Sequence, residues 1–281
     1  MSGTLFVVAT PLGNLEDLST RAVRILGAVA CIASEDTRRT AKLLAHFSIH
    51  TRTLSCHRFN ERQRLEPVLA LLREGNDVAL VSDGGTPCVS DPGAILVRAA
   101  LAEGVPVSPV PGPSAVATLL SASGFTAYRF VFDGFLPPRA GERRRRLREL
   151  ADERRTVVVY EAPHRIRPSL QDIAEVLRDR PLVLGRELTK RHETILRGTA
   201  ARVLAALGAG ETKGEITIAI GWEDDAAVSA FGEDRKTRVS RVWRAALTEA
   251  AGERREALRR AARTLGMKRA ELHRYLAELD E

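Results

Sequence analysis

Short apolar runs alternate with amphipathic segments along the first 110 residues. Four of these runs read as strands buried on both faces, at 5–9, 29–33, 77–81 and 105–110. The segments between them place apolar side chains at helical spacing, as in Leu65, Val68 and Leu72. Strands that alternate with helices over short connections predict a parallel sheet with right-handed crossovers.

A second α/β pattern begins near residue 116. Strands are expected at 129–132, 156–160 and 182–185, and we expect 192–197 and 215–221 to pair with each other as strands. We therefore predict two α/β domains, followed by a part that has no strand pattern.

The remainder of the chain is acidic and loop-like at first and then purely helical. Its last two helical patterns meet at Gly266, a spacing typical of a helix-turn-helix hairpin. The expected organisation is given by four ranges: an N-terminal α/β domain at 1–115, a second α/β domain at 116–224, a linker at 225–237 and a small C-terminal helical extension at 238–281.

Glycine-rich and polar stretches follow the predicted strands. The stretch 82–93 contains Gly84 and Gly85, which let the backbone turn sharply and approach a ligand closely. Asp91 and Pro92 in the same stretch are typical of a helix start, so we assign Asp91 to helix capping and not to chemistry. Similar stretches end the other strands, and together they predict a ligand cleft at the carboxyl edge of the sheets.

Composition changes this picture only in part. The 281 residues carry a net charge of +7, which is compatible with a polyanionic partner, although only five of the 43 basic residues are lysine, a bias that genome composition can produce. The cysteines Cys31, Cys56 and Cys88 are scattered, which suits a reducing cytoplasm and argues against a disulfide framework or a zinc site. We see no apolar run long enough to span a bilayer and expect no metal and no membrane.

Common cofactor and nucleophile motifs are absent from the sequence. It contains no GxGxxG in a dinucleotide-binding context, no GxxxxGK[ST], no GxSxG and no HExxH. The remaining polar groups are backbone donors, hydroxyls and a few carboxylates. These groups favour a small zwitterionic or nucleoside-like ligand over a triphosphate.

A succession of motifs gives the chain a family resemblance. In order, they are VATPLGNLEDLSTRA, ASEDTRRTAKLL, LVSDGGTPCVSDPG, PVPGPSA, GFLPPRAGERRRRL, YEAPHR, GRELTK and KGEITIAIG. With them, residues 4–221 resemble the tetrapyrrole methylase superfamily, in particular its branch that methylates ribosomal RNA. The resemblance implies a cytoplasmic homodimer that methylates the 2′-hydroxyl of a cytidine in the decoding region of 16S rRNA. It also implies S-adenosylmethionine held in a cleft between two α/β domains.

The resemblance also implies a set of cofactor-binding positions, many of them acting through the backbone. The chain departs from the family at Gly84, where alanine is usual, and at Ala162, where serine is usual. The implied positions are Pro11, Ser82, Asp83, Gly84, Thr86, Ser114, Ala115, Leu136, Glu161, Ala162, Gly214, Glu215 and Ile216.

Methyl transfer to a ribose hydroxyl is an in-line displacement, and a base assists it because the hydroxyl is a weak acid. The sequence does not choose among five candidates for this base. His164 could instead bind RNA phosphate, and Asp36 could be a helix cap alone. The candidates are Asp36, Asp83, Glu161, His164 and Lys190.

Basic clusters are the candidate RNA contacts, with solvated helix faces as the alternative. The helical tail also carries several arginines, such as Arg254 and Arg259, which could grip RNA or belong to a hairpin that shields apolar surface. The candidate contacts are Arg38, Arg39, Lys42, Arg139, Arg143, Arg144, Arg145, Arg146 and Arg165.

Two other functions remain open from the sequence. One is a C-methyltransferase acting on a tetrapyrrole, and the other is a helix-turn-helix nucleic-acid binder whose α/β part senses a ligand. The arginine clusters favour RNA over a porphyrin, which would call for a more apolar cavity. The density of polar loops in residues 1–221 favours an enzyme over a binder.

Overall fold

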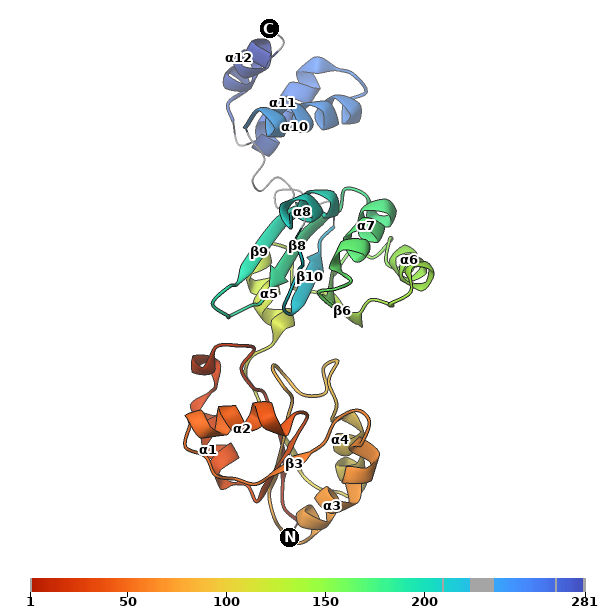
Figure 1. The fold of residues 1–281 in the computed structure, drawn as a ribbon. Coiled ribbons are helices and arrows are strands. Elements are labelled where there is room, and N and C mark those ends of the chain that lie inside the picture. The colour runs from red at the N-terminus through yellow and green to blue at the C-terminus, as the bar shows by residue number, and fades with distance from the viewer. Residues whose placement is uncertain (1, 209, 223–234, 266, 280–281) are drawn as a thin grey trace. The chain divides into compact units, whose positions relative to one another are not determined.

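A computed structural model describes residues 2–208, 210–222, 235–265 and 267–279 (Figure 1). The chain divides into two compact units, Met1–Val228 and Ser229–Glu281, each described here by itself. Most of the linker expected at 225–237 lies outside the described residues, and its last three positions open a helix.

The first sheet is entirely parallel, as its sequence pattern predicts. The strand order is β3-β2-β4-β1-β5, so the first strand of the chain lies inside the sheet. The strands are β1 (Leu5–Val8), β2 (Cys31–Ser34), β3 (Thr53–Ser55), β4 (Val78–Val81) and β5 (Val107–Val110). The helices are η1 (Leu15–Asp17), α1 (Thr20–Ala28), α2 (Thr37–His46), α3 (Glu61–Arg73) and α4 (Ala94–Ala102).

Helices cover both faces of the first sheet (Figure 1). On β4, Val78 and Leu80 belong to the core beneath α3 and α4, whereas Ala79 and Val81 belong to the core beneath α1 and α2. Successive side chains of a strand point to opposite faces, so a fully apolar strand fits only between two helical layers. The continuous apolar runs in the sequence have this physical origin.

The second sheet is mixed, with the strand order β6-β7-β10-β8-β9. Strand β10 lies at its centre, antiparallel to both neighbours. The expectation that 192–197 and 215–221 pair with each other is therefore wrong, because β8 separates β9 from β10. All of β10 is buried, as a central position requires, whereas β9 is mostly half-buried and forms an edge. The strands are β6 (Phe130–Phe135), β7 (Thr156–Glu161), β8 (Pro181–Arg186), β9 (Thr194–Thr199) and β10 (Ile216–Ile220).

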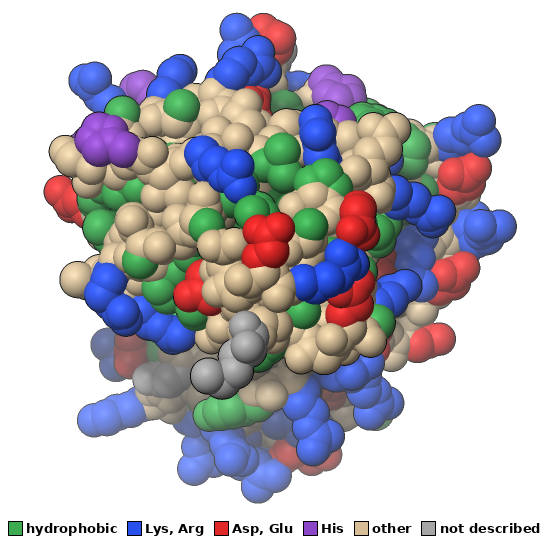
Figure 2. Space-filling model, turned by 90° about the horizontal axis from the view of Figure 1, so that it is seen from below, with side chains coloured by type: hydrophobic (Ala, Val, Ile, Leu, Met, Phe, Trp, Pro, Cys, Tyr) green, Lys and Arg blue, Asp and Glu red, His purple; other side chains and the backbone are tan. Residues whose placement is uncertain are grey.

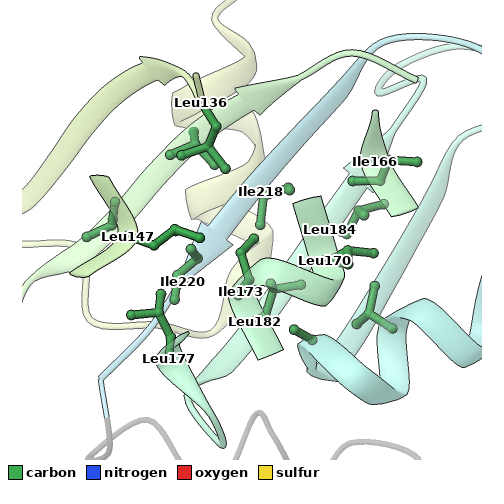
Figure 3. Packing of buried hydrophobic residues seen from close by; sticks show 14 of the residues in the cluster. Leu136, Leu147, Ile166, Leu170, Ile173, Leu177, Leu182, Leu184, Ile218 and Ile220 are labelled. Atoms are coloured by element: carbon green, nitrogen blue, oxygen red, sulfur yellow. The ribbon is translucent and has the colours of Figure 1, made fainter. Parts of the chain in front are cut away.

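The second sheet is also covered on both faces. Figure 3 shows Leu170 and Ile173 of α7 packed with Ile218 and Ile220 of β10, in the larger core of this sheet. Helices α6 (Ala140–Glu149), α7 (Ile166–Leu177) and α8 (Ala200–Ala206) contribute to that core. Helix α5 (Ala115–Ser123) packs on the opposite face, where Ala219 of β10 points.

The second unit is helical and has a hydrophobic core of its own. It contains α10 (Arg235–Glu249), α11 (Arg254–Leu265) and α12 (Arg269–Leu279). Val239 and Val242 of α10, Ala257 and Ala261 of α11 and Leu272 of α12 are buried together. The C-terminal helices therefore cover one another's apolar faces.

No helix in the described ranges is long and apolar enough to cross a membrane.

Glu61 caps helix α4 from a distance. Its buried carboxylate oxygen Oε1 accepts hydrogen bonds from the backbone N–H groups of Gly93 (3.1 Å), Ile95 (2.9 Å) and Leu96 (3.0 Å). A carboxylate at a helix N-terminus satisfies donors that the helix itself leaves unpaired. The helix begins at Ala94, so the expectation that Asp91 caps it is wrong.

Replacing Glu61 with alanine should destabilise the protein. Three N–H groups, two of them buried, lose their acceptor, and we expect a loss of ~1–3 kcal/mol in the free energy of unfolding. Urea denaturation measures this loss. The matched control is Glu66→Ala on the same helix, because Glu66 makes an exposed ion pair with Arg73, and exposed pairs contribute little to stability. Equal losses in the two variants would contradict the capping role.

Candidate functional site

Two loops at the carboxyl edge of the first sheet are joined through their backbones. The N–H of Thr10 donates to the carbonyl of Gly85, and the N–H of Gly85 donates to the carbonyl of Thr10, both over 2.9 Å. The Thr10 hydroxyl also donates to the carbonyl of Ser82 over 3.0 Å. These bonds hold the loop after β1 against the loop after β4.

The glycine at position 85 makes this contact possible. Gly85 has a φ of +91°, a conformation that residues with a Cβ rarely adopt. Gly84 approaches the other loop so closely that a Cβ would lie 3.1 Å from the carbonyl oxygen of Pro11. A third loop joins them, because the Thr86 hydroxyl donates to the carbonyl of Pro113 over 3.1 Å.

A cavity of about 390 Å³ opens beside these loops. Its walls come from the strand-end loops of the first sheet and from β7, β10 and neighbouring residues of the second sheet, including the aromatic rings of Phe135 and Tyr160. Its volume lies within the range usual for ligand sites. Nine of the expected cofactor positions line it: Asp83, Gly84, Thr86, Ser114, Ala115, Glu161, Ala162, Glu215 and Ile216.

The other four expected positions lie elsewhere. Pro11 and Ser82 line an adjacent cavity of about 290 Å³, and Gly214 lines a third one. Leu136 is 1% exposed and belongs to the core of the second sheet. Its side chain packs in this core, and the expectation that position 136 contributes to cofactor binding stays a prediction.

Carboxylates concentrate at the 390 Å³ cavity. Glu35, Asp83, Asp91 and Glu215 line it, and Arg39 is the basic residue among its described lining. Burial raises the pKa of Glu35 and of Asp83 above their ordinary values. The cavity therefore offers an environment that suits a cation.

Asp91 has the largest of these shifts. Burial raises its pKa to about 6; the Ser82 hydroxyl lowers it, while the charges of nearby carboxylates, Glu35 and Asp83 among them, raise it. Sequence reasoning missed Asp91 because the Asp-Pro pair is typical of a helix start. The residue instead precedes the helix and faces the cavity, since Glu61 takes over the capping. The sequence feature that could have identified Asp91 as a site residue is its place on a loop that follows a buried strand.

Asp83 is held in place at the junction of the two cavities. Its Oδ1 accepts a hydrogen bond from the N–H of Asp36 over 3.0 Å, and its Oδ2 lies 3.5 Å from Nη1 of Arg39. It lines both the 390 Å³ and the 290 Å³ cavity. Among the five candidate bases, Asp83 thus has the position that reaches two potential ligands.

Asp36 caps helix α2. Its carboxylate accepts hydrogen bonds from the backbone and side chain of Arg38, which lower its pKa to about 2. It does not line either cavity within the described residues. Asp36 therefore acts as a cap, one of the two roles that the sequence left open.

Both carboxylate oxygens of Glu161 have partners within the second domain. One carboxylate oxygen pairs with Nη2 of Arg165 at 2.6 Å and accepts from the N–H of Ala162 at 2.7 Å, while the other accepts from the Ser169 hydroxyl. Arg165 is correspondingly a partner of Glu161 and 18% exposed. Glu161 lines the 390 Å³ cavity, and neither it nor Arg165 has the freedom expected of a base or an RNA contact.

Lys190 and His164 have different surroundings. Burial lowers the pKa of Lys190, but its hydrogen bond to Glu187 (2.8 Å) and the charge of Glu215 (3.3 Å) outweigh this and raise the pKa. The amine is therefore protonated at neutral pH and cannot accept a proton. Its alkyl chain crosses Gly13, where a Cβ would lie 2.1 Å from Cγ. His164 lines the third cavity together with Arg167 and Lys213.

The arginines of helix α6 do not form a single RNA-facing row. Arg143 is 3% exposed, and its Nε donates to Oδ2 of Asp172 over 2.7 Å. Its role is structural, which corrects its assignment as an RNA contact. Arg144 shares Asp172, and Arg146 pairs with Asp133. Basic and acidic side chains are likewise interspersed on the described part of the face shown in Figure 2.

Four of the candidate RNA contacts are exposed to solvent. Arg38, Arg139 and Arg145 have side chains that are 88%, 84% and 76% exposed, each near an acidic neighbour. Lys42 is exposed and makes no ion pair with any described residue. Lys42 and Arg39 both line the 290 Å³ cavity.

Comparison with known proteins places these features in a family. Residues 4–204 match the family model described as Tetrapyrrole (Corrin/Porphyrin) Methylases. The chain belongs to the tetrapyrrole methylase family. Among its relatives are proteins named ribosomal RNA small subunit methyltransferase I. The one from Pseudomonas aeruginosa is 46% identical over 83% of this chain and 84% of its own length.

Other members agree with this assignment. A relative of the same name from Xylella fastidiosa is 48% identical over 83% of this chain and 87% of its own length. The one from Thermotoga maritima is 43% identical over 78% of this chain and 98% of its own length. These tetrapyrrole methylases match across both α/β domains.

Solved structures show the same fold. Uroporphyrin-III-C-methyltransferase from Thermus thermophilus has a TM-score of 0.56 at 23% identity and covers 82% of this chain and 98% of its own. The methyltransferase CobJ has a TM-score of 0.60 at 18% identity, over 79% of this chain and 95% of its own. The two-domain architecture is thus that of tetrapyrrole methylases.

Asp91→Asn should stabilise the protein at alkaline pH. The folded-state pKa of about 6 exceeds the ordinary value of 3.8, so the folded protein holds this proton more tightly than the unfolded chain. The stabilisation is complete below pH ~3.8 and is lost as the pH rises through 6. We expect the variant to melt a few degrees higher than the wild type at pH 8, with a smaller difference at pH 5.

Thermal denaturation at both pH values measures this effect. Asp152→Asn, at an exposed position, is the matched control and should shift the melting temperature equally at both pH values. A gain for Asp91→Asn that does not depend on pH would contradict the titration of Asp91.

Proposed function

We propose that this chain transfers the methyl group of S-adenosylmethionine to the 2′-hydroxyl of a cytidine in the decoding region of 16S rRNA. The observation that carries the proposal is identity of 43–48% to relatives named ribosomal RNA small subunit methyltransferase I, extending over both α/β domains. We further propose that it acts as a homodimer in the cytoplasm, as its family resemblance implies.

The 390 Å³ cavity has the chemistry that S-adenosylmethionine requires. The molecule carries a sulfonium and an ammonium cation. The lining of this cavity includes the carboxylates of Glu35, Asp83, Asp91 and Glu215, and Arg39 is the basic side chain among the described lining residues. The rings of Phe135 and Tyr160, 5.4 Å apart between centroids, offer an aromatic wall for its adenine. A related uroporphyrin-III C-methyltransferase was crystallised with S-adenosyl homocysteine, at 20% identity and a TM-score of 0.57.

We propose Asp83 as the base among the five candidates, because the surroundings of the other four suit this role less well. Asp36 caps a helix, Glu161 is bound by three donors, and Lys190 holds its proton. His164 lines the third cavity and not the 390 Å³ cavity where Asp83 lies. The bound methyl donor supplies an activated methyl group, and the contribution of Asp83 is to accept the proton of the attacking hydroxyl.

The alternative substrate, a tetrapyrrole, suits this cavity less well. A porphyrin ring would need broad apolar walls, whereas the described lining includes five carboxylates once Glu161 is counted. The tetrapyrrole-acting structures are less than 25% identical and share the fold alone. A ligand-sensing nucleic-acid binder is disfavoured because the chain belongs to a family of methyltransferases.

Labelled S-adenosylmethionine tests the proposed function directly. The purified protein is incubated with small ribosomal subunits that lack the modification, and the labelled nucleotide is mapped. We expect label on the ribose of one cytidine in the decoding region. Label on a base, label in a tetrapyrrole offered in parallel, or no transfer would overturn the proposal.

Gly85→Ala should weaken the binding of S-adenosylmethionine. A Cβ at the φ of +91° strains the backbone, and relief of ~1–3 kcal/mol of strain moves the loop that lines the cavity. We expect about a tenfold rise in the dissociation constant, measured by titration calorimetry. Gly84→Ala is the matched control, because its φ is ordinary and the Pro11 carbonyl must yield only slightly; a change of twofold or less is expected. Equal effects would contradict this account.

A further inference from the structure

The 290 Å³ cavity adjoins the 390 Å³ cavity and shares part of its wall. Leu12, Arg39, Asp83 and Glu215 line both. The remaining walls of the smaller cavity come from the loop after β1, from helix α2 and from Lys190. The two cavities therefore meet at these shared residues.

The two cavities differ in charge. The larger one is lined by five carboxylates and one arginine, whereas the smaller one is lined by Arg39, Lys42 and Lys190 against Asp83 and Glu215. The larger cavity also holds the aromatic rings, and none lines the smaller one within the described residues. A cationic methyl donor therefore favours the larger cavity, and a phosphate-bearing ligand favours the smaller one.

The three basic residues of the smaller cavity are not equivalent. Arg39 lies 3.5 Å from Asp83, and Lys190 is hydrogen-bonded to Glu187 and Glu215. Lys42 is exposed on α2 and forms no ion pair with the described residues. Its charge is thus the one available to an incoming anion. Lys–phosphate contacts position a nucleic acid without reading its sequence.

We propose that the smaller cavity receives the target nucleotide, with Lys42 bound to a neighbouring backbone phosphate and Asp83 facing the ribose 2′-hydroxyl. This inference rests on the proposed function, because it assigns the substrate side of the same site. Extrusion of a nucleotide into a fitted cavity is how enzymes reach single nucleotides in structured nucleic acid.

The chemical step then takes place where the two cavities meet. The 2′-oxygen forms a bond to the methyl carbon while the carbon–sulfur bond breaks, and the electron pair of that bond stays on sulfur. The 2′-hydroxyl proton passes to the Asp83 carboxylate. The hydrogen bond from the N–H of Asp36 keeps Oδ1 of Asp83 oriented during this transfer.

Lys42→Ala tests the assignment of the cavity. We expect the KM for unmethylated small subunits to rise several-fold, because one phosphate contact is lost. The dependence of log KM on log salt concentration should become shallower by about one. The dissociation constant for S-adenosylmethionine, measured by calorimetry, should stay within twofold of the wild type. Lys42→Arg should restore most of the subunit affinity.

One control and one further variant make the outcome specific. Arg98→Ala removes an exposed positive charge from α4, away from both cavities, and should leave KM and the salt dependence unchanged. Asp83→Asn, assayed at saturating methyl donor, should lower kcat about 10²–10⁴-fold and abolish the acidic limb of the pH–rate profile.

The outcomes separate the two proposals. If the wild type labels no ribosomal RNA, the proposed function fails. If the wild type labels the cytidine but Lys42→Ala behaves like Arg98→Ala, or weakens the methyl donor instead of the subunit, the assignment of the smaller cavity is overturned. A pH–rate profile in Asp83→Asn that matches the wild type would remove Asp83 as the proton acceptor.

Discussion

The site depends on one pair of backbone hydrogen bonds, those that join Thr10 to Gly85. Strands β1 and β4 are neighbours in the first sheet, so the loops that leave their carboxyl ends begin side by side. The reciprocal bonds turn this proximity into a rigid wall, and a glycine in the left-handed region is what lets the chain complete the pair. Every further contact of the site, from Thr86 to Asp83, is positioned relative to that wall.

The charged residues around the site fall into two groups, those that form an ion pair within the described protein and those that do not. Glu161 is paired with the half-buried Arg165, and Arg143 with the buried Asp172, all within the second domain. Asp91 and Glu35 form no ion pair with a described cation, and burial raises the pKa of each. Such uncompensated burial costs stability and is typical of functional sites, where the missing partner is a ligand.

Much of the fold could be predicted from local pattern, because burial on two faces leaves a readable apolar run. The parallel first sheet and the strand over 156–160 were predictable for that reason. The wrong predictions concern interactions between distant residues. Glu61 caps the helix in place of Asp91, although 32 residues separate Glu61 from Gly93. Arg143 pairs in the interior with Asp172, which belongs to another helix. A local pattern cannot show that a better acceptor or a buried partner arrives from elsewhere.

The central place of β10 has a consequence for the order in which the protein can form during synthesis. β10 is the last strand in sequence, yet its edges carry both β7 and β8. A nascent chain that ends before residue 216 can complete the first sheet, but its second sheet lacks the middle and exposes two open edges. Ile216 and Thr217, which line the larger cavity, belong to this same strand. The larger cavity is therefore completed by the last described strand of the α/β region to leave the ribosome.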